Sequence, residues 1–179
     1  MSTPTKLQVL LSKKRYLTLE LQQVTAQHGE YYTEFVKHVK ALEQTHDTQI
    51  LQETEKKVKK SSNTDDIDIL VKSLYRKIAN AAHPDKTGGD IDKAKLYKEA
   101  TVAKKINSVT DILDICDQLK VIIPPLDAKY YRMIQSDLEK LEQQIIQLRA
   151  SDCYVWGEAD DCLKGSMDKH ILNPPNKNK

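Results

Sequence analysis

The first part of the chain shows a helical spacing of apolar residues. From about Leu7 to Val58 there is no proline and a single glycine, Gly29. Apolar residues recur mostly three, four or seven positions apart, with charged residues and glutamines between them, which is the pattern of an amphipathic helix. The spacing predicts one long helix, or two helices interrupted near residues 28–30. The apolar positions are Leu10, Leu17, Leu21, Val24, Tyr31, Phe35, Val39 and Leu42.

A second amphipathic helix is predicted from about Asp65 to Ala82. The stretch KKVKKSSNTD, residues 56–65, precedes it as a linker, because its serines, Asn and Thr favour turns and caps. Acidic residues crowd the first turn of the helix, where negative charge is favourable. The helix has one apolar face at i, i+3, i+4 spacing and a basic face off it. The apolar positions are Ile67, Leu70, Val71, Leu74, Ile78 and Ala82, and the basic positions are Lys72, Arg76 and Lys77.

The chain is expected to turn after this helix. A residue before proline is driven away from α geometry, so the helix should end near His83. A Thr-Gly-Gly loop follows, and Asp90 offers an N-cap for a third helix. This third helix is predicted to reach about Leu119, with a bend or break at residues 107–108. The double proline in VIIPPL, residues 121–126, ends it.

Residues 127–150 have the most regular pattern in the chain. Their apolar positions alternate by three and four, as in a short heptad seam. Such a seam is unfavourable in water, so it should pair with the N-terminal helix of the same chain or with another copy, as a homodimer through residues 131–148. The seam positions are Tyr131, Ile134, Leu138, Leu141, Ile145 and Leu148.

These patterns predict an all-α protein, since no segment has the alternation of a strand. We divide the chain into residues 1–60, a long N-terminal helix or coiled-coil region; 61–123, the central helices; 124–150, the C-terminal heptad helix; and 151–179, a partly disordered tail. The aromatic residues Tyr154 and Trp156 of the tail should either dock on the helices or bind a partner. With 39% apolar and 30% charged residues, the chain favours a helical, solvent-rich architecture without a large enclosed active site.

Charge and cysteine content narrow the choice of partners. The net charge is only +2, from 28 basic and 26 acidic residues, and it does not indicate nucleic acid or a membrane as a partner. The N-terminal apolar run is too short for a signal peptide or a membrane span. The cysteines form no CxxC pair, which favours a reducing location, cytoplasmic or nuclear. We expect neither cofactor nor metal, because the histidines beside the N-terminal seam lack matching ligands. The residues concerned are Cys116, Cys153, Cys162, His28, His38 and His46.

The stretch NAAHPDKTGGD, residues 80–90, invites a chemical interpretation. His83 and Asp85 could be imagined as an acid/base pair. The sequence gives them no nucleophile, metal set or glycine-rich phosphate cradle, and a loop between two short helices excludes little water. We therefore expect no catalysis by this chain. The remaining alternatives are a plain interhelical turn, in which Pro and Gly punctuate the chain, and a binding loop.

The residues that lead into this loop resemble the J-domain of DnaJ-like co-chaperones. In LYRKIANAAHPDK, residues 74–86, the tyrosine, the paired basic residues, the apolar positions and His-Pro-Asp-Lys fall at the family's spacing. J-domains bind a 70-kDa heat-shock chaperone and stimulate its ATP hydrolysis, with His-Pro-Asp at the turn of a helical hairpin. The resemblance covers roughly residues 50–123. The chaperone-binding residues that it implies are Lys72, Tyr75, Arg76, Lys77, His83, Pro84, Asp85 and Lys86.

Two parts of the family pattern are altered. In the third helix, Tyr97 takes the place of the usual phenylalanine and Ala100 that of an isoleucine, while Ala103 matches the family's alanine. A rival register, AKKINSVTDIL, would need six extra loop residues. We prefer the first, because the loop is compact. The family's first helix would fall at residues 49–60, the end of the long N-terminal helix, where the usual Tyr-x-x-Leu is missing.

The resemblance implies a co-chaperone of the type that carries only the J-domain. The sequence has no Gly/Phe-rich linker, no CxxCxGxG repeats and no β-sandwich pattern for client binding. We predict a protein that binds a 70-kDa heat-shock chaperone and stimulates its ATP hydrolysis, with the flanking helices giving client or location specificity. The alternative is a helical scaffold or adaptor with a J-like fold, which acts by coiled-coil assembly.

Overall fold

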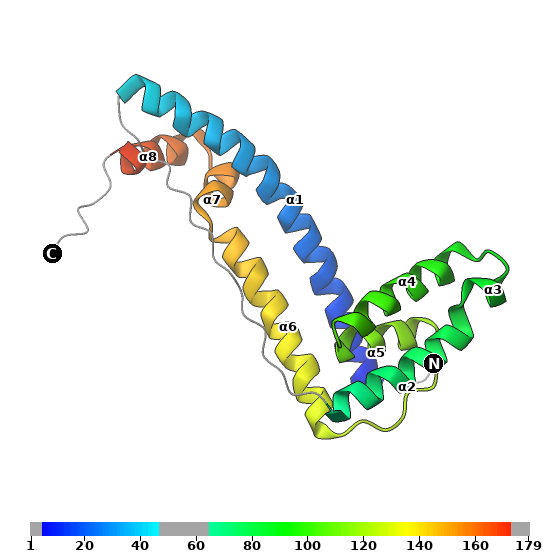
Figure 1. Cartoon of the computed structure of the whole chain (residues 1–179). Helices are drawn as coiled ribbons and strands as arrows, with labels where there is room; N and C mark the ends of the chain where they lie inside the picture. Colours follow the sequence, from blue (N-terminus) through cyan, green and yellow to red (C-terminus); the bar gives the residue numbers. More distant parts are fainter. Residues whose placement is uncertain (1–4, 47–64, 173–179) are drawn as a thin grey trace. The chain divides into compact units, whose positions relative to one another are not determined.

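The computed structural model describes residues 5–46 and 65–172, and within these ranges the chain is all-α, with eight helices and no strand. This confirms the fold class predicted from the sequence. The helices are α1 (Lys6–His46), α2 (Asp65–Ala82), α3 (Pro84–Thr87), α4 (Ile91–Lys105), α5 (Val109–Gln118), α6 (Ala128–Arg149), α7 (Asp152–Glu158) and α8 (Asp161–Leu172) (Figure 1). In the described ranges, no helix combines the length and the apolar character needed to cross a membrane.

The chain forms two compact units, and both are discontinuous in sequence. Unit 1 comprises residues 1–16 and 59–140, and unit 2 comprises residues 17–58 and 141–179. The boundaries fall inside α1 and α6, so each of these helices contributes to both units.

Unit 1 is built around a hairpin of α2 and α4, with the short α3 at its turn and α5 packed against the pair (Figure 1). The apolar face predicted for α2 is the face that packs, and it meets small residues of α4. The start of α1 and the first half of α6 add further apolar side chains. Buried residues of this unit include Leu11, Val71, Leu74, Ile78, Ala82, Ala100, Ala103, Ile112, Leu113, Cys116, Ile134 and Leu138.

The predicted break in the third helix is present. Helix α4 ends at Lys105, Asn107 adopts a left-handed conformation with φ of 56°, and Ser108 caps α5 by accepting a hydrogen bond from the backbone N–H of Asp111 at 3.3 Å. Short polar side chains favour caps and tolerate left-handed backbone, which explains why the chain bends here. The bend folds α5 back onto α2 and α4.

Helix α1 is continuous through residues 28–30, so the structure has one long helix rather than two. It ends at His46. The predicted continuation to Val58 and the predicted first J-domain helix at residues 49–60 lie outside the described residues. The stripe is also shifted at its start, because Leu11 is completely buried whereas Leu10, the residue predicted from the spacing, is half-buried.

Unit 2 contains the segment expected to be a partly disordered tail, of which residues 151–172 are described and mostly helical. The ring of Tyr154 packs edge-on against Tyr31 of α1, with centroids 5.4 Å apart. Trp156 packs in the same way against Phe35, at 5.7 Å. The aromatic residues of α7 therefore dock on α1, which was one of the two alternatives left by the sequence.

Candidate functional site

The turn at residues 83–90 is ordered by its own hydrogen bonds. His83 is extended, with φ of −62° and ψ of 133°, and it caps α3, in which Pro84 is the first residue. Proline suits this position because its missing N–H would have no helical partner. The His83 carbonyl accepts hydrogen bonds from the N–H groups of Lys86 (2.9 Å) and Thr87 (3.2 Å), and its ring Nδ1 accepts one from the N–H of Asp85 (3.3 Å). The His-Pro-Asp segment therefore begins a short helix.

Two glycines and a cap then reverse the chain. Gly88 and Gly89 have φ of 60° and 92°, in the left-handed region where a side chain is strained. Asp90 caps α4 by accepting a hydrogen bond from the N–H of Lys93 at 3.1 Å. This backbone hydrogen bond, aided by the side chain of Lys93, lowers the pKa of Asp90 below its ordinary value. The loop is thus anchored at its far end by a charged cap.

We expect Asp90→Ala to lower the melting temperature by roughly 2–4 °C, because α4 loses its N-cap acceptor. The pKa of Asp90 is lower in the folded chain than in the unfolded chain, so its contribution is complete above the unfolded value and is lost as the pH falls through the folded value. Thermal scans should therefore show the difference from wild type at pH 7 and a shrinking difference below about pH 4. Asp90→Asn, which keeps an acceptor, is the matched control. An equal difference at all pH values would contradict the charged-cap account.

The ring of His83 rests against α4. It meets the ring of Tyr97 edge-on, with centroids 5.1 Å apart. Tyr97 is itself fixed, because its hydroxyl accepts a hydrogen bond from Tyr75 of α2 at 3.2 Å. The Tyr75 hydroxyl also lies 3.3 Å from the hydroxyl of Thr101. A small hydroxyl network thus joins the two helices behind His83.

Asp85 is the most exposed acidic group of the turn. Its side chain is 86% exposed, and its carboxylate lies 3.5 Å from Nδ1 of His83. No other ion pair involves Asp85 within the described ranges. The turn therefore presents one carboxylate, at a position set by the first turn of α3.

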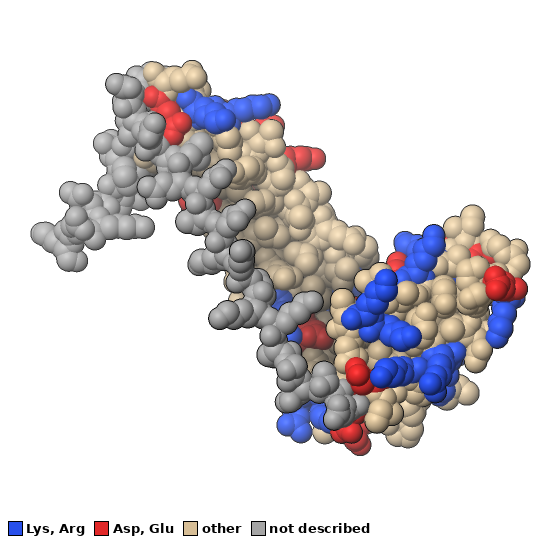
Figure 2. Space-filling view, viewed as in Figure 1, with Lys and Arg blue, Asp and Glu red and all other residues tan. Residues whose placement is uncertain are grey.

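Lys72 and Arg76 form the exposed basic face of α2. They are one turn apart and both exposed. Lys72 lies 3.7 Å from Asp68 of the preceding turn, and Arg76 has no ion-pair partner among the described residues. Figure 2 shows Lys and Arg side chains gathered over α2 and α4. This surface would attract an acidic partner.

Three further predicted site residues form hydrogen bonds within the chain. The ammonium of Lys77 donates to the carbonyl of Ile122, in the segment after α5, at 3.0 Å. The ammonium of Lys86 donates to the side-chain oxygen of Asn80 at 3.0 Å. Tyr75 turns its hydroxyl toward α4, where it lies 3.2 Å from the hydroxyl of Tyr97 and 3.3 Å from that of Thr101. The structure therefore places Lys72, Arg76, Lys77 and the turn on the exposed surface, with Lys77 and Lys86 held by hydrogen bonds and Tyr75 half-buried behind them.

The support of the turn from α4 was missed in the sequence. Tyr97 was recognised only as a substitute for a core phenylalanine, and neither Thr101 nor Lys104 was singled out. The Lys104 ammonium lies 4.3 Å from the centre of the Tyr75 ring, a cation–π contact. The sequence did offer one signal for this contact, a tyrosine on each helix of the predicted hairpin, because two hydroxyls that face each other can form a hydrogen bond.

In the described part of the chain, no group of three or more His, Cys, Asp or Glu side chains could hold a metal ion. Burial raises the pKa of the Cys116 thiol to about 12, so that this cysteine is not a nucleophile at neutral pH.

A scan against protein-family models finds no match to the chain, and searches of curated proteins and of solved structures find none either. The functional interpretation therefore depends on the residues and on the geometry described above.

Proposed function

We propose that this chain is a co-chaperone that binds a 70-kDa heat-shock chaperone and stimulates its ATP hydrolysis. The observation that carries the proposal is the turn of the α2–α4 hairpin, where His83, Pro84 and Asp85 are held in a short helix with the Asp85 carboxylate 86% exposed. The residue types and their order are those of the J-domain resemblance. The placement at the tip of a two-helix hairpin is the one that the resemblance implies.

The charges suggest how the contact would form. Lys72 and Arg76 are exposed on one side of α2, and cations on one face give fast, salt-sensitive association with an acidic surface. Pro84 restricts the backbone ahead of Asp85, and the hydrogen bond from the Asp85 N–H to the His83 ring fixes the start of α3. A single carboxylate would then enter the chaperone at a defined place. ATP hydrolysis would occur in the chaperone, and this chain would supply no catalytic group.

The decisive measurement is the ATPase rate of a 70-kDa heat-shock chaperone with wild-type chain and with His83→Gln. We expect the wild type to stimulate the rate and His83→Gln to return it to the basal value, because the variant loses the imidazole that caps α3 and packs on Tyr97. His38→Gln is the matched control, since His38 lies in unit 2, where it contacts Asp168 and Trp156. Wild type and His83→Gln that both leave the rate at its unstimulated baseline would remove the proposal.

One observation supports the alternative, a helical scaffold or adaptor. Helices α1 and α6 each contribute to both units. In unit 1 the ammonium of Lys6 lies 5.3 Å from the centre of the Tyr131 ring, and in unit 2 Arg149 forms an ion pair with Glu20 at 2.9 Å. Long helices paired in this way suit assembly. A chain that leaves the ATPase rate unchanged yet binds a client through these helices would be a scaffold.

Three of the six positions of the heptad seam of α6 are buried within one chain. Ile134 is 0% exposed, and Leu138 and Ile145 are 3% and 4% exposed. The burial of these three side chains supports cover by helices of the same chain rather than by another copy. A homodimer through residues 131–148 stays a prediction, as does a cytoplasmic or nuclear location.

A further inference from the structure

Helix α4 has apolar residues on two opposite faces, which distinguishes it from an ordinary surface helix. Its inner face carries the buried Ala100 and Ala103. On the opposite face Ile91 is 83% exposed, Val102 is 58% exposed, and Ile106, the residue after the helix, is 60% exposed. A helix at the surface of a globular protein normally has a polar outer face. The outer face of α4 therefore calls for an explanation other than the folding of unit 1.

The outer residues form one stripe, which we call the α4 stripe: Ile91, Lys95, Lys98, Val102 and Ile106. Their spacing of four, three, four and four keeps them on one side of the helix. At a rise of 1.5 Å per residue the stripe is about 22 Å long. Exposed apolar residues that are scattered singly need no explanation, but these recur in register at both ends of one stripe. The pattern is that of half a helix pair.

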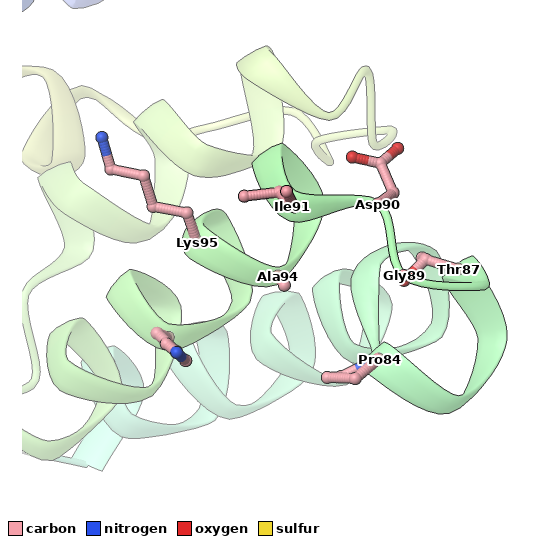
Figure 3. A pocket seen from close by; sticks show the side chains of 8 residues that line it. Pro84, Thr87, Gly89, Asp90, Ile91, Ala94 and Lys95 are labelled. Atoms are coloured by element: carbon pink, nitrogen blue, oxygen red, sulfur yellow. The ribbon is translucent and has the colours of Figure 1, made fainter.

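A groove lies beside the first end of the stripe. It has a volume of about 470 Å³, and its lining includes Pro84, Ile91, Ala94, Lys95 and Lys98. Figure 3 shows Pro84 below the start of α4, with the side chain of Ala94 above it. A bulky apolar side chain of a partner could enter here next to Ile91.

The charged residues of the stripe indicate which kind of helix it could bind. Lys95 and Lys98 are exposed at its middle and have no ion-pair partner in the part of the chain that the structure describes. Lysines at seam positions disfavour a second copy of the same stripe, because like charges would face each other. They favour a helix that presents carboxylates at its centre. Asp92 and Glu99, also exposed, lie along one flank of the stripe and would favour basic residues on the matching edge of the partner.

We propose that the α4 stripe binds an acidic amphipathic helix of another protein, with aliphatic side chains against Ile91 and Val102 and carboxylates against Lys95 and Lys98. This mode is that of a helix laid along an apolar groove, with anchor residues at helical spacing. The stripe lies on α4, whereas Lys72 and Arg76 lie on α2, and the groove shares Pro84 with the turn. The proposal is argued from the α4 side chains and does not rest on chaperone binding. It gives the hairpin a second face for a client or an assembly partner.

The test uses the full chain and a synthetic helical peptide of about 18 residues, long enough to span the stripe. The probe carries Leu at the positions that face Ile91 and Val102, and Glu at those that face Lys95 and Lys98. A control peptide has Lys in place of Glu. Fluorescence anisotropy should show the Glu peptide binding at least about tenfold more tightly than the Lys peptide, and this preference should weaken with salt.

Variants of the chain then assign the contact to the stripe. The double variant Lys95→Glu with Lys98→Glu should reverse the preference, so that the Lys peptide binds more tightly. Val102→Asn, which removes the apolar contact without adding a charge, should weaken both peptides. The matched control is Lys72→Glu with Arg76→Glu on α2, which changes the same number of charges and should leave the preference for the Glu peptide in place.

Several results would overturn the proposal. They are the absence of binding, equal binding of the two peptides, a preference that the α2 variant removes, and a preference that the α4 double variant leaves intact. Vesicles of phosphatidylserine and phosphatidylcholine provide a further arm. Binding to the anionic vesicles that depends on Lys95 and Lys98, without binding of the Glu peptide, would identify the stripe as a membrane-contacting surface instead.

Discussion

Gly157→Ala should destabilise unit 2 by about 2 kcal/mol, because position 157 has no room for a side chain. A Cβ atom there would overlap the ring of Tyr31 on α1. The ring has little freedom to retreat, since its edge contact with Tyr154 has a centroid distance of 5.4 Å and its hydroxyl donates to Glu158 at 2.6 Å. The same hydrogen bond raises the pKa of Tyr31 to about 12. The clash would therefore separate α7 from α1.

Urea unfolding followed by tryptophan fluorescence measures this effect, because Trp156 is the single tryptophan of the chain and lies in unit 2. Gly29→Ala is the matched control. Gly29 is inside α1, and nothing lies within 4 Å of a Cβ added there. This control should be neutral or stabilising. In a Tyr31→Ala background, Gly157→Ala should cost much less. An equal cost in both backgrounds would contradict the proposed clash.

Arg15→Ala should destabilise unit 1 by about 2 kcal/mol, because it takes the best partner from a buried carboxylate. Asp114 is 7% exposed, and its Oδ1 lies 2.6 Å from Nε of Arg15. Arg15 also reaches Asp117, with Nη2 at 2.6 Å from Oδ2. Burial acts to lower the pKa of Arg15, but the hydrogen bonds to Asp117 and Asp114 outweigh it and the pKa is raised. The expected loss of stability is smaller than for a fully buried pair, because the Arg15 side chain is 35% exposed.

Circular dichroism during urea unfolding would measure the loss. Arg132→Ala is the matched control, because Arg132 is exposed on α6 and has no ion pair within the described ranges. The double variant Arg15→Met with Asp114→Leu should recover much of the stability, since apolar residues of similar volume often replace a buried ion pair without cost. A single variant as stable as wild type would show that Lys14, 3.6 Å from Asp114, compensates for the lost guanidinium.

The elements of the hairpin were predictable from the sequence, because local rules determine them. The face of α2 has regular i, i+3, i+4 spacing, and its buried members include Val71, Leu74 and Ile78. The turn depends on the proline after His83, which disfavours helical geometry in the residue before it. It also depends on the two glycines before Asp90, which adopt a left-handed backbone without strain. The break at residues 107–108 also follows from local preferences for caps and left-handed backbone.

The contacts between distant segments could not be predicted in this way. Arg15 and Asp114 are 99 positions apart, and no periodicity links them. The burial of Leu11 follows from the same contact, because Leu11 and Arg15 are one turn apart on the side of α1 that meets α5. The sequence shows an apolar residue at both 10 and 11, so spacing alone could not select between them. The orientation of Lys77 could not be predicted from the sequence either, since its partner is the backbone carbonyl of Ile122.

The discontinuous make-up of unit 1 has a consequence for how the chain is synthesised. Residues 1–16 leave the ribosome before residues 59–140, which form the other part of their unit. Contacts of high sequence separation form slowly, because the intervening chain must be ordered first. The start of α1 must therefore wait, with Leu11 and Arg15 uncovered, until α5 has emerged. A fragment limited to α2–α5 would avoid this delay, but it would expose Asp114 of α5 without Arg15.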